Sequence, residues 1–308
     1  MTRPPAPGTA DFAPGAGPEY VAAPDGVPIA VYTDGDRSRP PVLLVHGFPD
    51  THRAWDAVAA ALATDHYVVR YDVRGAGASG RPASLAGYHL DRLADDLFAV
   101  ADAVSPGRPV HLAGHDWGSI QAWHAATDPR AAMRIASYTT ISGPCLDHVG
   151  FWFRDRLTRR SPRDLASLGL QSALSWYVWV FQVPMLPPLA WRLGLARAWP
   201  GLLRLLEGVT PRDGLPAATL AADAAHGIGL YRANMRQRLL HPSERHALVP
   251  VQLITVTGDH YVSPALAGSD LDRWASDLTR RTIPGTHWSI LEGTPVAEAI
   301  REFAGRQA

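Results

Sequence analysis

The stretch Gly114-His115-Asp116-Trp117-Gly118 decides the fold. It follows the apolar run Val110–Ala113 and precedes Ser119–Ala126, a run with the spacing of a helix. A polar residue flanked by glycines, where a buried strand passes into a helix, is typical of a nucleophile elbow, a sharp turn that exposes its central side chain. The chain is therefore expected to contain a strand–elbow–helix unit that presents Asp116.

The residue at the centre of this turn sets the chemistry. Most such elbows carry serine, whose alkoxide attacks acyl carbons. A carboxylate is a poor acylating nucleophile, but it can displace a leaving group from an sp3 carbon and form an alkyl ester. We therefore expect Asp116 to attack sp3 carbon, and the elbow alone leaves the leaving group open.

The composition is that of a globular protein, with 46% hydrophobic and 19% charged residues. Lys plus Arg and Asp plus Glu both number 29, so the overall charge gives no reason to expect binding to nucleic acid or to an anionic membrane. The single cysteine, Cys145, excludes a disulfide within the chain and predicts no metal cluster. The apolar stretch Leu165–Val183 is too polar and too short for a stable membrane span, and we expect a cytoplasmic protein.

Strand and helix patterns alternate through most of the chain, which predicts an α/β protein with a mostly parallel sheet covered on both faces. The predicted strands are Glu19–Ala23, Ile29–Thr33, Pro41–Val45, Tyr67–Tyr71, the run at Val110, Ile135–Ile141, Val251–Thr257 and Thr279–Ile283. The first two flank Pro24-Asp25-Gly26 and form a hairpin. The predicted helices are Arg53–Ala63, Asp91–Val104, a helix from the elbow to about Thr127, and Val296–Phe303.

The middle of the chain has a different pattern. From Cys145 to Arg245 strand signals give way to helical, aromatic and proline-punctuated sequence. We predict a core made of residues 19–144 and 246–308, a helical lid of residues 145–245, and a disordered tail of residues 1–18 that is rich in Pro, Ala and Gly.

A carboxylate nucleophile needs a base to cleave its ester. His287 follows the last predicted strand, and imidazole titrates near neutral pH, so it is the expected base. Asp259 follows the preceding strand and is expected to orient His287, with Asp147 as the fallback. Nucleophile, acid, histidine is the chain order of α/β-hydrolases. The backbone N–H groups of Phe48 and Trp117 are the expected oxyanion donors, the former aided by a cis peptide bond before Pro49.

The motifs HGFP (residues 46–49), GHDWG (114–118) and HW (287–288) resemble those of the epoxide hydrolases of the α/β-hydrolase superfamily. The resemblance spans the chain after the tail. It implies that two lid tyrosines protonate the epoxide oxygen: Tyr177, in a stretch that ends in Phe-Gln-x-Pro, and Tyr231, in the run Tyr-Arg-Ala-Asn-Met. One departure is Thr286, where the family commonly has glycine. The N-terminal part also resembles bacterial proteins in which such a domain precedes a short-chain dehydrogenase.

The tyrosines also make chemical sense, because a phenol is far more acidic than the alcohol formed when an epoxide opens. The resemblance therefore implies an epoxide hydrolase with no metal or organic cofactor, whose partners are a small apolar epoxide and water. It leaves a homodimer open. An aromatic lid predicts an apolar pocket. We expect its contacts with substrate to come from four aromatic residues: Trp117, Trp179, Phe181 and Trp288.

Two alternatives remain. A haloalkane dehalogenase would use the same aspartate, with the indole N–H of Trp117 as a halide ligand. It usually needs a second side-chain donor, which Phe48 does not offer. A non-catalytic binding protein with this fold is the other alternative, although every expected catalytic position is filled.

Overall fold

The structure is a computed structural model, and it describes residues 17–210, 214–268, 270–289 and 293–307. Its centre is an eight-stranded sheet in the order β1-β2-β4-β3-β5-β6-β7-β8. The strands are β1 (Glu19–Ala22), β2 (Pro28–Asp34), β3 (Pro41–Val45), β4 (Tyr67–Tyr71), β5 (Val110–His115), β6 (Ile135–Ile141), β7 (Val251–Gly258) and β8 (Leu278–Thr286). The hairpin β1–β2 is antiparallel and joins β4 in antiparallel fashion, while the pairs from β4 to β8 are parallel.

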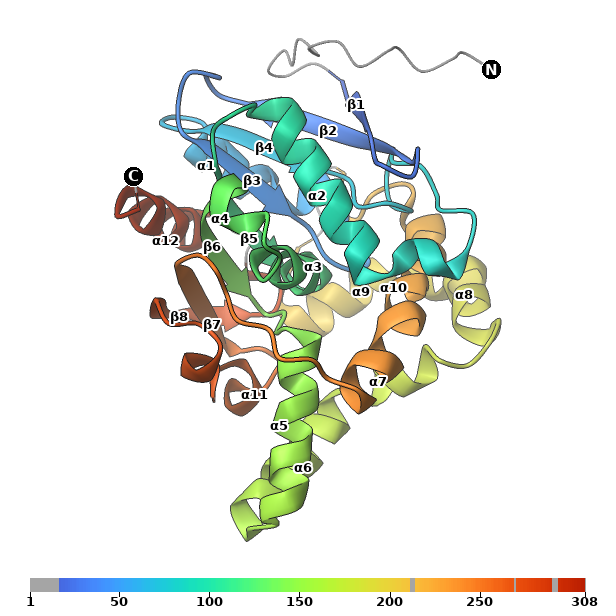
Figure 1. Cartoon of the computed structure of the whole chain (residues 1–308). Helices are drawn as coiled ribbons and strands as arrows, with labels where there is room; N and C mark the ends of the chain where they lie inside the picture. The colour runs from blue at the N-terminus through green and yellow to red at the C-terminus, as the bar shows by residue number, and fades with distance from the viewer. Residues whose placement is uncertain (1–16, 211–213, 269, 290–292, 308) are drawn as a thin grey trace.

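Helices cover both faces of the sheet (Figure 1). Strand β3 shows why, because all five of its residues are buried and alternate between the two faces. Leu43 and Val45 pack with helices α2 and α3, and Val42 and Leu44 pack with α1 and α12. The covering helices are α1 (Asp56–Leu62), α2 (Leu90–Val104), α3 (Trp117–Ala126), α4 (Ala131–Arg134), α11 (Pro264–Gly268) and α12 (Thr294–Gly305).

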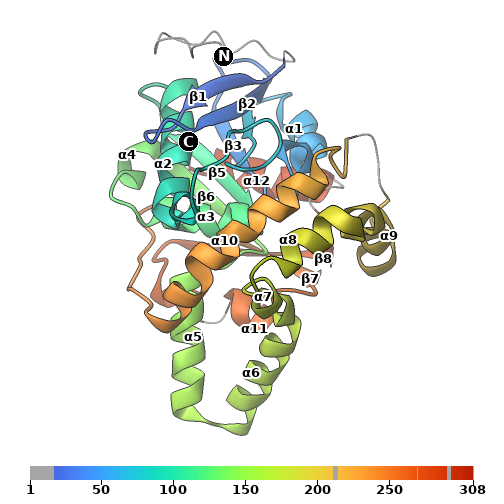
Figure 2. The same cartoon turned by 90° about the vertical axis from the view of Figure 1, so that its right-hand side faces the viewer.

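The segment between β6 and β7 folds as helices, as its sequence predicts. They are α5 (Leu146–Arg159), α6 (Pro162–Leu174), α7 (Trp176–Val180), α8 (Leu186–Ala190), α9 (Ala196–Glu207) and α10 (Leu220–Leu240), with a π-helical turn, η3 (Trp191–Leu195), between α8 and α9. Figure 2 shows these helices gathered below the sheet, with α5 and α6 projecting as a hairpin and α10 crossing in front of α3.

The predicted α/β fold with a mostly parallel sheet is confirmed, and the differences lie at the ends of elements. The helix predicted from Arg53 begins instead with a 3-10 turn, η1 (His52–Trp55), before α1. Strand β8 runs three residues beyond the predicted end at Ile283, to Thr286. Residues 1–16 of the predicted tail lie outside the described residues.

No described helix has the length and apolar character required to cross a bilayer. Nor do the described residues include a group of three or more His, Cys, Asp or Glu side chains that could hold a metal ion.

Candidate active site

Asp116 occupies the turn between β5 and α3, as the sequence predicts. Its backbone φ is 51°, a left-handed conformation that L-residues rarely adopt, and its carbonyl accepts from the Ile120 N–H at the start of α3. Glycines let other backbone segments come close. A Cβ at Gly118 would lie 2.0 Å from the Val45 carbonyl oxygen, and one at Gly143 would lie 2.1 Å from that of Asp116. The elbow therefore requires glycine at these two positions.

Backbone amides hold the Asp116 carboxylate. The Phe48 N–H donates to Oδ1 at 2.7 Å, and the Trp117 amide makes a second hydrogen bond. Burial raises the pKa of Asp116, whereas His287 and these two amides act to lower it. The Phe48–Pro49 peptide bond is cis, as predicted. The two amides expected to be oxyanion donors therefore both bind the Asp116 carboxylate, with Phe48 at Oδ1 and His287 on the side of Oδ2.

His287 is buried beside Oδ2. Its Nε2 lies 3.8 Å from Asp116 Oδ2, and its Nδ1 lies 3.2 Å from both carboxylate oxygens of Asp259. Burial alone would lower the pKa of His287, but the charges of Asp259 and Asp116 raise it to about 9. His115, from the elbow, uses its Nε2 to hold the His287 carbonyl at 2.8 Å. The residue predicted as base thus lies between two carboxylates.

Asp259 is fixed by the loop that follows β7. Its Oδ1 accepts from the backbone N–H groups of Tyr261 and Val262 at 2.8 and 3.0 Å. Burial opposes its ionisation, but the positive charge and hydrogen bond of His287 hold the pKa of Asp259 well below its usual range. The fallback acid, Asp147, instead binds Arg245 at 2.8 Å and the Ser243 N–H at 2.9 Å. The geometry favours Asp259 as the partner of His287.

The two predicted tyrosines meet above the elbow. Tyr177 comes from α7 and Tyr231 from α10, and their hydroxyls are hydrogen-bonded to each other. The Trp117 ring lies 4.8 Å from that of Tyr231 and its side chain hydrogen-bonds the Tyr231 hydroxyl. Burial and the Asp116 charge raise the pKa of both phenols, so both are protonated.

A cavity joins the nucleophile to these tyrosines. Asp116, Trp117, Tyr177, Tyr231 and Trp179 line it, and most of the remaining wall is apolar.

Two aromatic residues predicted to contact substrate lie beside this cavity rather than in its wall. The Phe181 ring packs edge-on against Phe48 and Tyr231 at 5.5 and 4.9 Å. The Trp288 indole N–H donates to Asp50 at 3.0 Å, which turns the ring into the core. Sequence position alone could not show that these rings have other partners.

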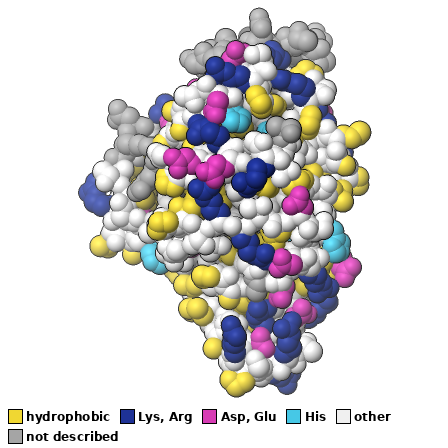
Figure 3. Space-filling model, turned by 90° about the vertical axis from the view of Figure 1, so that its left-hand side faces the viewer, with side chains coloured by type: hydrophobic (Ala, Val, Ile, Leu, Met, Phe, Trp, Pro, Cys, Tyr) yellow, Lys and Arg dark blue, Asp and Glu magenta, His cyan; other side chains and the backbone are white. Residues whose placement is uncertain are grey.

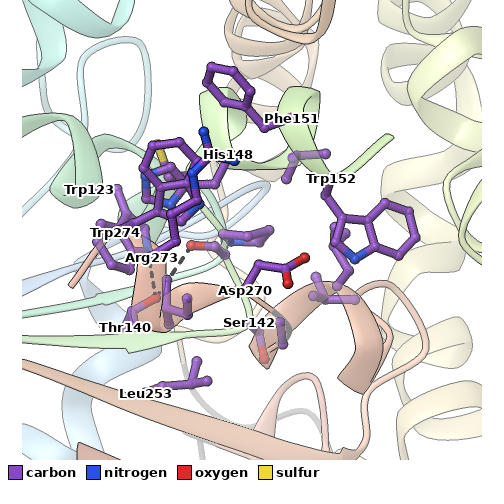
Figure 4. Close-up of a pocket in the computed structure, with 18 of the residues that line it drawn as sticks. Trp123, Thr140, Ser142, His148, Phe151, Trp152, Leu253, Asp270, Arg273 and Trp274 are labelled. Atoms are coloured by element: carbon purple, nitrogen blue, oxygen red, sulfur yellow. Dashed lines mark hydrogen bonds between the residues drawn. The ribbon is translucent and has the colours of Figure 1, made fainter. Parts of the chain in front are cut away.

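A second cavity is lined in part by Ser142. Figure 4 shows Trp123, His148, Phe151 and Trp274 around it, with Arg273 over the Trp274 ring at 4.3 Å. It shares Ser142, Pro144, Val149, Val262 and Leu266 with the first cavity but is not lined by Asp116, so it lies apart from the candidate nucleophile.

Comparison with known proteins places the chain in a family. A family model described as the alpha/beta hydrolase fold matches residues 40–294. The chain belongs to this α/β-hydrolase family. It is 40% identical over 291 residues to "Probable oxidoreductase EphD" of Mycobacterium tuberculosis, which covers 92% of this chain and 49% of that protein. The chain thus spans about half the length of that relative.

Two further proteins are similar to this α/β-hydrolase. "Epoxide hydrolase A" of Mycobacterium tuberculosis is 36% identical over 133 residues, covering 43% of this chain and 40% of that protein. A solved variant of an epoxide hydrolase from Bacillus megaterium has a TM-score of 0.77 at 19% identity, covering 93% of this chain and all of the other. At that identity the likeness shows the shared fold.

The structure adds two residues to the site of this α/β-hydrolase that the sequence did not single out. The Tyr261 ring lies 4.7 Å from His287 and 5.7 Å from Tyr177. Glu207, at the end of α9, hydrogen-bonds Tyr261, and its carbonyl accepts from the Thr286 hydroxyl at 3.0 Å. Tyr261 follows Asp259 by two residues, which could have drawn attention to it. Glu207 is distant in sequence and carries no such signal.

Proposed function

We propose that the protein is an epoxide hydrolase, which opens an epoxide to a vicinal diol through a covalent ester on Asp116. One observation carries the proposal: Asp116 and two protonated phenols, those of Tyr177 and Tyr231, line one largely apolar cavity. This arrangement suits a substrate that accepts a carboxylate at carbon and a proton at oxygen. We further propose that residues 145–245 act as a lid over the core formed by residues 19–144 and 246–308.

In the first step, Oδ2 of Asp116 attacks one carbon of the epoxide. A carbon–oxygen bond to Asp116 forms while the ring carbon–oxygen bond breaks. Tyr177 and Tyr231 donate hydrogen bonds to the ring oxygen, and one phenol gives it a proton. The Phe48 and Trp117 amides position the carboxylate for attack.

In the second step, water cleaves the ester. His287 takes one proton from the water, whose oxygen attacks the carboxyl carbon of Asp116. Negative charge gathers on Oδ1, to which the Phe48 amide donates, and the nearby Trp117 amide also stabilises it. Collapse of this intermediate releases the diol. Asp259 stabilises the imidazolium. His287, cationic in the free protein, loses its proton when the ester forms, and that proton neutralises the tyrosinate. The proton that His287 then takes from water restores the starting state.

The leaving group separates this proposal from haloalkane dehalogenation. A halide site would need the indole N–H of Trp117, but the Trp117 side chain is hydrogen-bonded to the Tyr231 hydroxyl. Phe48 offers a backbone N–H and no side-chain donor. Several similar proteins, among them "Epoxide hydrolase A", carry names that support an epoxide as the substrate.

A product assay tests the proposal. The purified protein is incubated separately with styrene oxide and with 1-chlorobutane, and diol and chloride are both measured. We expect diol from the epoxide, no chloride from the haloalkane, and no diol from the Asp116→Asn variant over the time of one wild-type turnover. Chloride release without diol would replace the proposal with the dehalogenase.

A further inference from the structure

The outer face of the proposed lid is unusually apolar for a surface in water. Many large hydrophobic side chains along α6 to α9 are at least two-fifths exposed. Those from α7 onward are here named the apolar lid face: Trp176, Trp179, Val183, Met185, Leu186, Leu189, Leu193, Leu205 and Leu206. So many large apolar side chains in contact with water favour docking against another apolar surface.

Helical spacing explains how this face arises. In the nearly continuous helical run α8–η3–α9, Leu186, Leu189 and Leu193 recur at i, i+3 and i+7 and point outward. Trp191 and Trp199 lie on the inner side, where they pack against α10 residues such as Ile228. The run therefore has two apolar sides, and only one of them packs inside the protein.

The charges on this face have one sign. From residue 165 to residue 206 the sequence contains no Asp or Glu, yet Arg192, Arg197 and Arg204 are exposed within it. Elsewhere the signs are mixed: Figure 3, which shows the face opposite to that of Figure 2, has basic and acidic side chains interspersed. The zero net charge of the whole chain thus conceals a local excess of positive charge.

We infer that the apolar lid face is a docking surface for anionic lipid bilayers. Exposed tryptophans and leucines enter the boundary between headgroups and acyl chains, and arginines pair with anionic headgroups. A second copy of the chain fits less well. A symmetric contact would bring arginines of one copy against those of the other, and the segment has no acidic residue to pair with them.

The same face leads to the cavity. Trp179 is 64% exposed at the surface and also lines the cavity that contains Asp116. An apolar molecule dissolved in a bilayer would therefore meet the mouth of the cavity where the lid docks. Docking itself needs no reaction, so it is tested without an epoxide.

Co-sedimentation with vesicles tests the inference. We expect the protein to sediment with vesicles of phosphatidylcholine that contain 30 mol% phosphatidylglycerol. It should sediment only weakly with vesicles of phosphatidylcholine alone, because each arginine near an anionic surface strengthens binding about fivefold. The triple variant Arg192→Gln, Arg197→Gln and Arg204→Gln should then bind anionic vesicles about 100-fold more weakly. Leu205→Asp, at a side chain 80% exposed, should lower it at least tenfold and leave styrene oxide turnover unchanged.

A matched control comes from the other end of the molecule. Met133, on α4, is 75% exposed, and Met133→Asp should leave vesicle binding unchanged. Equal losses in Leu205→Asp and Met133→Asp, or no sedimentation with anionic vesicles, would overturn the inference. A dimer, seen by light scattering and dissociated by Leu205→Asp, would also overturn the inference if the wild-type protein does not bind vesicles.

Discussion

Removal of the Asp116 charge should lower the pKa of His287 by up to about 3 units. Nε2 of His287 and Oδ2 of Asp116 are 3.8 Å apart, and the two side chains are only 3% and 14% exposed. At an effective dielectric constant of about 20, two unit charges at this distance interact by about 4 kcal/mol, which equals about 3 pKa units. An ester on Asp116 is neutral, so alkylation removes this interaction.

The consequence for the proposed cycle is a change in the state of His287. In the free protein the pKa of His287 is about 9, so the ring is cationic at neutral pH and cannot accept a proton. With a neutral group on Asp116 the pKa should fall to roughly 6, and the ring becomes a competent base. Formation of the ester would thereby prepare the group that cleaves it.

NMR titration of labelled imidazole tests this coupling, with Asp116→Asn as a neutral mimic of the ester. His287 is assigned from the signal missing in His287→Gln. We expect its midpoint near 9 in the wild-type protein and about 3 units lower in Asp116→Asn. Asp272→Asn, which removes an exposed charge paired with Arg280, should leave the midpoint unchanged. The same midpoint in the wild-type protein and in Asp116→Asn would refute the reasoning.

Three further predictions concern the lid, the elbow and pH. Tyr177→Phe and Tyr231→Phe should each slow ester formation about 10- to 100-fold, since a hydrogen bond to a developing charge contributes about 1.5–3 kcal/mol; unchanged single-turnover rates in both variants and in the double variant would exclude the tyrosines. Gly118→Ala should destabilise the fold by about 2–4 kcal/mol in urea unfolding, because its Cβ meets the Val45 carbonyl, whereas Gly201→Ala, with open space around it, should not destabilise. The pKa of His287, about 9, exceeds that of a free histidine, so protonation of His287 stabilises the folded protein, by about 3 kcal/mol. This contribution is complete below about pH 6.5 and is lost as pH rises through 9. The difference in unfolding free energy between the wild-type protein and His287→Gln should therefore be smaller at pH 10 than at pH 6.

The sequence was most informative where local pattern and structure are directly linked. The buried strand Pro41–Val45 and the strand–turn–helix around Asp116 lie where the apolar runs and glycines predict them. The chain order also pointed to Asp116, Asp259 and His287, and the structure brings these three side chains together. These features depend on residues close together in sequence or on the regular succession of strands.

Tertiary contacts determined the rest. The indole of Trp288 is turned inward by Asp50, a partner 238 residues away that no local pattern reveals. Glu207 reaches Tyr261 and the Thr286 hydroxyl only because α9 packs near the end of β8. The charge of the chain as a whole also concealed the basic, apolar face of α7 to α9, because segregation of charge is visible only when exposed residues are separated from buried ones.

The central claim is that Asp116 forms an ester with the intact epoxide, and the mass of the protein tests it most directly. His287→Gln should form the ester but hydrolyse it slowly, since the base is missing. After incubation with styrene oxide, the account predicts a mass increase equal to the whole epoxide, located on the peptide that contains Asp116. The wild-type protein should show little adduct. An unmodified His287→Gln protein that still produces diol, or an adduct on another residue, would contradict the account.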